Sequence, residues 1–218
     1  MLDKLQAVYS RYEELCAKSE QPDFYNDPKK AAALLREKND LEPIVECYLA
    51  YRKAQQDLVD AEELMGMLVD NSDEPYAREI TRAVMNRRRK KLPIETTTQL
   101  KEVIEEALKF LPEKEYKETV KKSCQRTFQA LRIDVNHEFE VLYTFLEKLP
   151  EVLAPGGRVA ILTFHSGEDR LVKRSFKELQ KAGIYSEVAA DVIRPSAEEC
   201  ARNSRAKSTK MRWAIRAE

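Results

Sequence analysis

Several features are scarce in this sequence of 218 residues, and each scarcity argues against a class of protein. No apolar run approaches the roughly 20 residues of a membrane-spanning helix. Asp3 and Lys4 interrupt the N-terminus where a signal peptide would carry its apolar stretch. The four cysteines form no CxxC pair, and only His137 and His165 could add imidazole ligands, which argues against a zinc site or a disulfide framework. We therefore expect a cytoplasmic protein with no metal and no membrane contact.

Glycine and charge are unevenly distributed along the chain. Of the five glycines, only Gly66 lies in the first 150 residues. Residues 1–66 carry 9 basic and 14 acidic side chains, a net charge of −5, whereas residues 67–218 carry 29 and 24, a net charge of +5. These shifts indicate two parts of different architecture, with a boundary at Gly66.

The acidic first part has the pattern of paired helices. Apolar residues recur from Leu2 to Leu15 at helical spacing, and Asp27 followed by Pro28 is a typical start for a second helix. Seven-residue spacing of apolar side chains in this second helix predicts a long helical neighbour. Pro43 is expected to kink or break it. The pattern predicts a helical hairpin without catalytic residues.

The motifs MLDKLQAVYSRYEEL, NDPKK and NDLEPIVECYLAYRKAQQDLVDAEELM carry a resemblance. Residues 1–66 resemble the N-terminal helical domain of bacterial peptide chain release factors. Those proteins hydrolyse peptidyl-tRNA through a Gly-Gly-Gln loop in a later domain, and this sequence contains no GGQ. The resemblance therefore implies no termination chemistry in this chain.

The basic second part has an α/β pattern. Helices are expected from Ser72 to the basic run Arg87–Lys91, from Thr96 to Pro112, and through the apolar stripe of residues 128–146. The continuous apolar run Val159–Phe164 is typical of a strand covered on both faces, which implies a parallel sheet. A helix capped by Ser166 follows, and a last strand at Met211–Arg216 is expected to pair with residues 185–193.

Three motifs of this part carry a second resemblance: QRTFQALRIDVNHEFE, LAPGGRVAILTFHSGEDRLVKRSF and IRPSAEECARNSRAKSTKMRWAIRA. From about Asn71 to the end, the chain resembles the C-terminal part of the RsmH (MraW) family of 16S rRNA cytosine-N4 methyltransferases. Thr163 and Gly167 depart from the serine and leucine more usual in the family, which suggests a subgroup. The resemblance implies an incomplete Rossmann-like methyltransferase sheet, with residues 67–122 as a helical insertion and residues 123–218 as the second half of the α/β fold.

The resemblance also bears on the methyl donor and on partners. Family members hold S-adenosylmethionine at the ends of the first four strands, beginning with a glycine-rich loop, and no G-x-G occurs before Gly156. We expect this chain alone not to bind that cofactor. The partner implied is 16S rRNA or the small ribosomal subunit. An unpaired strand edge at residues 159–164 is expected to self-associate or to accept a partner chain that supplies the missing half-sheet.

Eight residues are candidates for contact with RNA or substrate: His165, Asp169, Arg126, Arg132, Asn136, Arg194, Arg202 and Arg205. His165 lies where a strand gives way to a helix, the edge at which α/β folds place ligands; the alternative is a hydrogen bond to a neighbouring turn, for example to Asp169. Arg126, Arg132 and Asn136 could contact phosphate or pair with Glu138, Glu140 or other carboxylates. The arginines near the C-terminus lie in a polar loop suited to backbone phosphates.

Three functional hypotheses remain open at this point. In the first, the chain resembles an rRNA methyltransferase and is inactive alone because the donor-binding half is absent. In the second, it is a non-catalytic ribosome-binding module or a protein related to release factors. A third reading is a fusion at Gly66 without selected activity. No catalytic residue is assigned.

Overall fold

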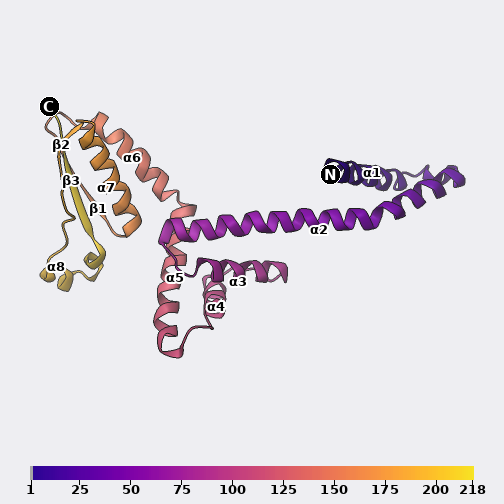
Figure 1. Ribbon diagram of the computed structural model, residues 1–218, viewed down its shortest axis with the longest axis horizontal. Helices are drawn as coiled ribbons and strands as arrows, with labels where there is room; N and C mark the ends of the chain where they lie inside the picture. The colour runs from indigo at the N-terminus through magenta and orange to yellow at the C-terminus, as the bar shows by residue number, and fades with distance from the viewer. Residues whose placement is uncertain (1) are drawn as a thin grey trace. The chain divides into compact units, whose positions relative to one another are not determined.

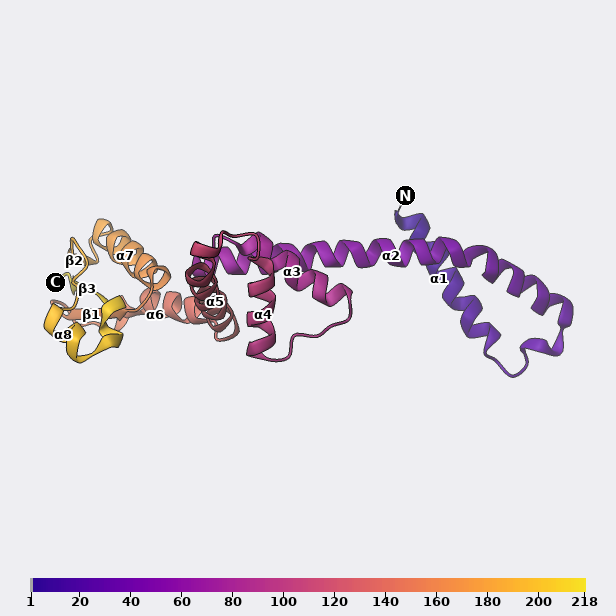
Figure 2. The ribbon, with the colours of Figure 1, turned by 90° about the horizontal axis from the view of Figure 1, so that it is seen from below.

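The computed structural model describes residues Leu2–Glu218, and Met1 lies outside the described residues. Helices predominate, and one small sheet lies in the C-terminal part (Figures 1 and 2). The chain divides into two compact units. The first unit contains the residues up to Leu64 together with Met85–Lys91, and the second contains Met65–Val84 and Leu92–Glu218. None of the described helices is long and apolar enough to span a membrane.

The first unit contains α1 (Leu2–Ser19), the short helix η1 (Phe24–Asn26) and most of α2 (Pro28–Ser72). The Asp27 carboxylate accepts hydrogen bonds from the backbone N–H groups of Lys29 and Lys30, both at 3.2 Å, which confirms the predicted start of the second helix.

Side chains of α1 and α2 meet at two levels. The Arg11 guanidinium donates to both carboxylate oxygens of Glu37 at 2.7 and 2.9 Å, and the Tyr48 hydroxyl donates to Gln6 at 2.7 Å. Gln6 precedes Arg11 in α1, but its partner Tyr48 follows Glu37 in α2. The two helices therefore run antiparallel.

Helix α2 extends past both residues at which the sequence suggested a change. It does not break at Pro43, because one missing N–H removes a single hydrogen bond from a long ladder. It also continues through Gly66, although the two compact units divide nearby, between Leu64 and Met65. Ser72 ends α2 and donates to the Leu68 carbonyl at 2.8 Å instead of starting the next helix, which begins at Ala77.

The second unit contains the sheet and most of the later helices, of which α6 and α7 supply the core residues that cover the sheet; α3 is divided between the two units. The helices are α3 (Ala77–Arg89), α4 (Thr97–Ala107), α5 (Glu113–Val135), α6 (Glu138–Val152), α7 (Ser166–Lys181), α8 (Ala197–Arg202) and η2 (Ser204–Ser208). The predicted capping box at α4 is confirmed: Thr96 and Gln99 satisfy each other's backbone N–H groups.

The sheet consists of β1 (Arg158–Thr163), β2 (Tyr185–Val188) and β3 (Lys210–Arg216) in the order β1-β3-β2. Both pairings are antiparallel, so the expected parallel sheet is wrong for the described strands. The last strand, β3, therefore lies between β1 and β2 and runs antiparallel to both. The predicted partnership of the last strand with residues 185–193 is confirmed by the β2 to β3 pairing and by a bridge between Ile193 and Met211.

Only one face of β1 is covered, which corrects the expectation of a strand buried on both sides. Val159 and Ile161 pack against a core formed by Leu146 and Leu149 of α6, Val172 and Phe176 of α7, Tyr185 of β2 and Ala214 of β3. Ala160 and Leu162 alternate with them and are exposed on the opposite face. A short apolar run does not reveal how many faces are covered, because both arrangements produce it. This core fixes the C-terminal end of β1 and the start of α7.

Candidate functional site

His165 occupies the turn between β1 and α7 and caps that helix. Its Nδ1 accepts a hydrogen bond from the Glu168 N–H at 3.4 Å. The Glu168 carboxylate reaches back and accepts from the N–H groups of Phe164 at 2.8 Å and His165 at 3.3 Å. The helix therefore begins one residue earlier than the expected Ser166 cap, because the imidazole and Glu168 form the reciprocal pair.

Burial and hydrogen bonding act in opposite directions on Glu168. Burial alone would raise the pKa of this carboxyl, but its contact with the His165 imidazole and the hydrogen bonds that it accepts from backbone N–H groups lower the pKa from 4.5 to about 2. The carboxylate is therefore charged at neutral pH. The other imidazole nitrogen, Nε2, lies 3.4 Å from Glu168 Oε1, and it is buried without a hydrogen bond to any residue of Leu2–Glu218.

Gly167 is required by close packing at this turn. A Cβ atom at this position would lie 2.5 Å from Phe139 Cζ and 3.2 Å from His165 Nδ1. The Phe139 ring of α6 lies 5.8 Å, centroid to centroid, from the His165 imidazole. The first turns of α6 and α7 therefore pack closely against each other beside His165.

The Asp169 backbone N–H donates to the His165 carbonyl at 3.3 Å, but the two side chains bond to other residues, so the expected bond between the imidazole and Asp169 is wrong in the described structure. Instead its carboxylate accepts two hydrogen bonds from the Arg212 guanidinium of β3, at 2.7 and 3.3 Å, and the Lys210 ammonium lies 3.7 Å away. Burial would raise the pKa of Asp169, but the hydrogen bond and the two positive charges outweigh it and lower the pKa. The exposed fractions of the Asp169 and Arg212 side chains are only 13% and 8%, so this ion pair ties α7 to the sheet.

The candidates at the end of α5 form a local cluster. Arg132 donates to both oxygens of Glu138 at 2.9 and 3.0 Å, and the Asn136 amide donates to the same carboxylate at 3.4 Å. The structure therefore favours the ion-pair interpretation over the phosphate interpretation for this pair. Arg126 is half-buried on α5 and forms no ion pair with the described residues.

The side chains of Glu138, His165 and Glu168 approach one another within 4.8 Å, a composition that could hold a cation. Two contacts oppose that role. Glu138 is already neutralised by Arg132, and His165 Nδ1 acts as an acceptor, so a neutral imidazole carries its proton on Nε2, where a metal would need a lone pair. The cluster is better suited to orient the β1–α7 turn.

Arg202 and Arg205 lie on short helices, which corrects the expected loop for these two, whereas Arg194 lies in an irregular segment as expected. Arg202 is on α8 and pairs with Glu198 at 2.6 Å. Arg194 precedes α8, and Arg205 lies on η2; both are exposed and form no ion pair within the described part of the chain. Asn203 and Ser196 supply the caps of these short helices, a signal that sequence reasoning missed.

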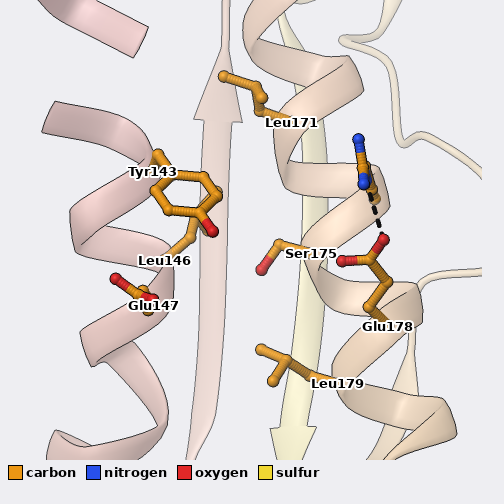
Figure 3. Close-up of a pocket in the computed structure, with 8 residues that line it drawn as sticks. Tyr143, Leu146, Glu147, Leu171, Ser175, Glu178 and Leu179 are labelled. Atoms are coloured by element: carbon orange, nitrogen blue, oxygen red, sulfur yellow. Dashed lines mark hydrogen bonds and ion pairs between the residues drawn. The ribbon is translucent and has the colours of Figure 1, made fainter. Parts of the chain in front are cut away.

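A groove of about 280 Å³ lies between α6 and α7. Figure 3 shows Leu171 and Leu179 of α7 facing Tyr143, Leu146 and Glu147 of α6 across this groove. Its polar rim includes the Glu178 carboxylate, which accepts a hydrogen bond from Arg174 at 2.8 Å. It contains no pair of groups arranged for acid–base chemistry.

The turn Gly156–Gly157 does not fit a loop that binds S-adenosylmethionine. The glycine pair Gly156–Gly157 forms a tight turn whose polar groups are already used: both residues bond to the Arg216 backbone, and the Gly157 N–H donates to the Ala154 carbonyl at 2.8 Å. A Cβ at Gly157 would lie 2.7 Å from that carbonyl, so the glycine serves the turn itself. No backbone N–H of this turn remains free for a ligand.

Residues 53–217 match the model of the MraW methylase family. The chain therefore belongs to this family, whose methyltransferases depend on S-adenosylmethionine. The three-stranded antiparallel sheet and its helices are consistent with part of a methyltransferase fold. The match begins before Asn71, so it includes the second half of α2, where the resemblance to release factors had been placed.

Curated relatives are named ribosomal RNA small subunit methyltransferase H, H 1 or H 2. This chain is 70% identical to ribosomal RNA small subunit methyltransferase H 1 of Lachnoclostridium phytofermentans over 155 residues. The matched residues make up 71% of this chain and 42% of that protein. The protein of the same name from Agathobacter rectalis is 65% identical over 162 residues, 74% of this chain and 46% of that protein. Ribosomal RNA small subunit methyltransferase H of Lactobacillus delbrueckii is 38% identical over 179 residues, 76% of this chain and 55% of that protein. The chain spans about half the length of the curated relatives it matches.

Proposed function

We propose that this chain is the RNA-facing part of a methyltransferase that modifies the N4 amine of a cytosine in small-subunit rRNA. The observation that carries the proposal is the family match over residues 53–217, together with relatives named as small-subunit rRNA methyltransferases. The net charge of +5 over residues 67–218 supports a nucleic-acid partner. The ribosomal substrate would put the protein in the cytoplasm.

The proposed RNA contacts divide into two kinds. Arg194 and Arg205 are exposed and without carboxylate partners among the described residues, so they are free to meet phosphates. His165, held by Glu168 and Phe139, would lie beside the substrate base at the end of β1. The other five candidates would support the fold and not touch RNA: Arg126, Arg132, Asn136, Asp169 and Arg202. All of them except Arg126 already make side-chain ion pairs or hydrogen bonds within the protein.

The RNA contacts are tested by the salt dependence of 16S rRNA binding. Replacing Arg194 and Arg205 by alanine is expected to flatten the slope of log K against log salt by roughly 1.4 to 1.8, the loss of two phosphate contacts. Arg174→Ala is the matched control, because Arg174 is also exposed but is paired with Glu178. An unchanged slope in the double variant, or an equal change in the control, would remove both arginines from the RNA interface.

We place the donor site outside the residues described here, because the Gly156–Gly157 turn uses its polar groups internally. The chain by itself is then inactive in methyl transfer. Calorimetric titration of the full chain with S-adenosylmethionine tests this point, and micromolar binding would refute it.

Residues before 53 lie outside the family match and include all of α1 with the first half of α2. The antiparallel pairing of these helices favours a second candidate function for this part, a release-factor-like helical module that docks on the ribosome. Deleting residues 1–26 removes α1 and is expected to weaken binding to 30S subunits but not to isolated 16S rRNA. Equal affinity of both proteins for 30S subunits would argue against this module.

A further inference from the structure

Helix α2 carries a stripe of exposed apolar side chains within the first compact unit. Its members repeat with the three- and four-residue spacing of a coiled-coil seam, and we call them the α2 stripe: Ile44, Cys47, Tyr51, Ala54, Leu58 and Ala61. Ile44, Tyr51 and Leu58 are 43%, 44% and 60% exposed. Cys47 and Ala54, which lie between them, are exposed as well.

The two elements that contact this part of α2 lie on other sides of the helix. On one side the buried Tyr48 bonds to Gln6 of α1, and on another Asp57 pairs with an arginine of α3. At about 100° per residue, Leu58 lies between these two sides, roughly 80° from Tyr48 and roughly 100° from Asp57. Neither α1 nor α3 therefore covers the α2 stripe.

Large and small side chains alternate along the α2 stripe. The positions at seven-residue spacing hold Ile44, Tyr51 and Leu58, and the positions between them hold Cys47, Ala54 and Ala61. Two such helices in parallel would set large against large and small against small, which crowds one layer and leaves a gap in the next. An antiparallel pair would set a large side chain against a small one in every layer.

We propose that the α2 stripe is an interface with a second copy of this chain, in which the two α2 helices pack antiparallel about a two-fold axis. With the axis between positions 52 and 53, the facing pairs are Ile44 with Ala61, Cys47 with Leu58 and Tyr51 with Ala54. Each pair joins the two copies and occurs twice. The stripe is thus complementary to itself, which is the reason to assign a second copy as its occupant.

The residues beside the α2 stripe are compatible with this pairing. In the same register Gln55 meets Tyr48 of the other copy, and Asp57 meets Ala50, so these flanking positions bring no two like charges together. The Asp57 carboxylate is in addition compensated by Arg89, 3.4 Å away. The stripe itself is uncharged, so phosphates of RNA would gain nothing from contact with it.

The size of the surface indicates a reversible dimer. The stripe runs for roughly 27 Å along α2, at about 1.5 Å per residue. With its flanking positions it offers roughly half of the about 20–30 residues that each side of a standard interface contains. We therefore expect a dissociation constant in the micromolar range. This inference does not depend on the proposed methyltransferase activity.

Sedimentation equilibrium of the full chain tests the interface. Leu58→Lys places a charge within the stripe and is expected to weaken dimerisation about tenfold or more. Leu49→Lys is the matched control, because Leu49 is a 43% exposed leucine of the same helix that lies about 180° from Leu58. It is expected to change the dissociation constant less than about twofold. Both leucines are exposed, so neither variant should unfold the chain, and circular dichroism checks this.

Ala54→Leu distinguishes complementary packing from general stickiness. The larger side chain adds apolar surface, so a non-specific apolar patch would associate more tightly. In the proposed interface Ala54 faces Tyr51 of the other copy, and overfilling this layer is expected to weaken dimerisation by about tenfold.

Disulfide formation reports the direction of the two helices. In the antiparallel pair Cys47 faces Leu58, so Leu58→Cys is expected to give a cross-linked dimer through Cys47 on mild oxidation. Leu49→Cys is the control and should not cross-link. A parallel pair would bring the two Cys47 side chains together and would cross-link the wild type.

A chain that stays monomeric at hundreds of micromolar, or a dimer that Leu58→Lys weakens no more than Leu49→Lys does, would overturn the inference. Tighter association of Ala54→Leu, or a wild type cross-linked through Cys47, would also overturn it, because the antiparallel packing of large against small side chains would then be wrong.

Discussion

The charge on Glu168 should stabilise the β1–α7 turn in a way that pH can remove. A carboxyl whose pKa is 4.5 in the unfolded chain and about 2 in the folded one contributes about 3 kcal/mol at neutral pH. Only 24% of the side chain is exposed, so solvent screens little of this energy. In Glu168→Gln the amide oxygen can still accept one backbone N–H, which restores about 1 kcal/mol. We therefore expect a loss of roughly 2 kcal/mol at pH 7.

The sign of the pH dependence follows from the lowered pKa. Stability from a carboxylate with a depressed folded pKa is fully present above pH 4.5 and is lost as the pH falls towards about 2. The wild type and Glu168→Gln should therefore differ at pH 7 and converge near pH 2. Other carboxyls titrate in both proteins, so the difference between the two isolates Glu168.

Urea unfolding followed by tryptophan fluorescence measures this difference. Trp213 is the sole tryptophan and lies in β3, so its emission reports the unit that contains the turn. Glu178→Gln is the control: it breaks a pair in which Arg174 and Glu178 are 77% and 62% exposed, and it should change stability by less than about 0.5 kcal/mol. A Glu168→Gln effect no larger than the control's, or one that persists at pH 2, would refute the reasoning.

Three further predictions concern residues of the same unit. Asp169→Asn should destabilise the Trp213-reported transition by about 3 kcal/mol, because it leaves Arg212 buried and unpaired, whereas Asp169→Leu combined with Arg212→Met should cost less; a larger loss in the double variant would contradict this. Gly167→Ala should cost about 1 to 3 kcal/mol in the same assay, and a loss that remains in a Phe139→Ala background would show that the clash is not its cause. Thr96→Ala should cost about 1 kcal/mol in urea unfolding followed by circular dichroism, and Thr96→Ser should retain most of that stability.

Local signals in the sequence located several elements well. Asp27 with Pro28 marks the start of α2, and Thr96 with Gln99 marks the start of α4, because helix capping depends on residues three or four positions apart. Pro43 and Gly66 do not end α2, because their local preferences for a break are small compared with the sum of the helix formers around them. The change in composition at Gly66 nevertheless lies beside the division between the two compact units.

The candidate site was likewise predicted from the sequence only in part. The sequence indicated that His165 follows a strand and begins a helix, and the structure agrees. It paired His165 with Asp169, whereas the folded chain pairs His165 with Glu168 and Asp169 with Arg212, 43 residues away. A carboxylate at a helix start has several partners within reach, and only the position of β3 decides among them.

By itself the sequence determined the family, the helix starts and the approximate place of the strands, because these depend on short patterns of apolar, capping and glycine residues. Tertiary structure alone decided that the sheet is antiparallel, that β1 is covered on one face, and that its other edge is free. The reason is physical: a strand's own residues present the same alternating backbone groups in every sheet, and only its neighbours in space determine which of those groups are satisfied.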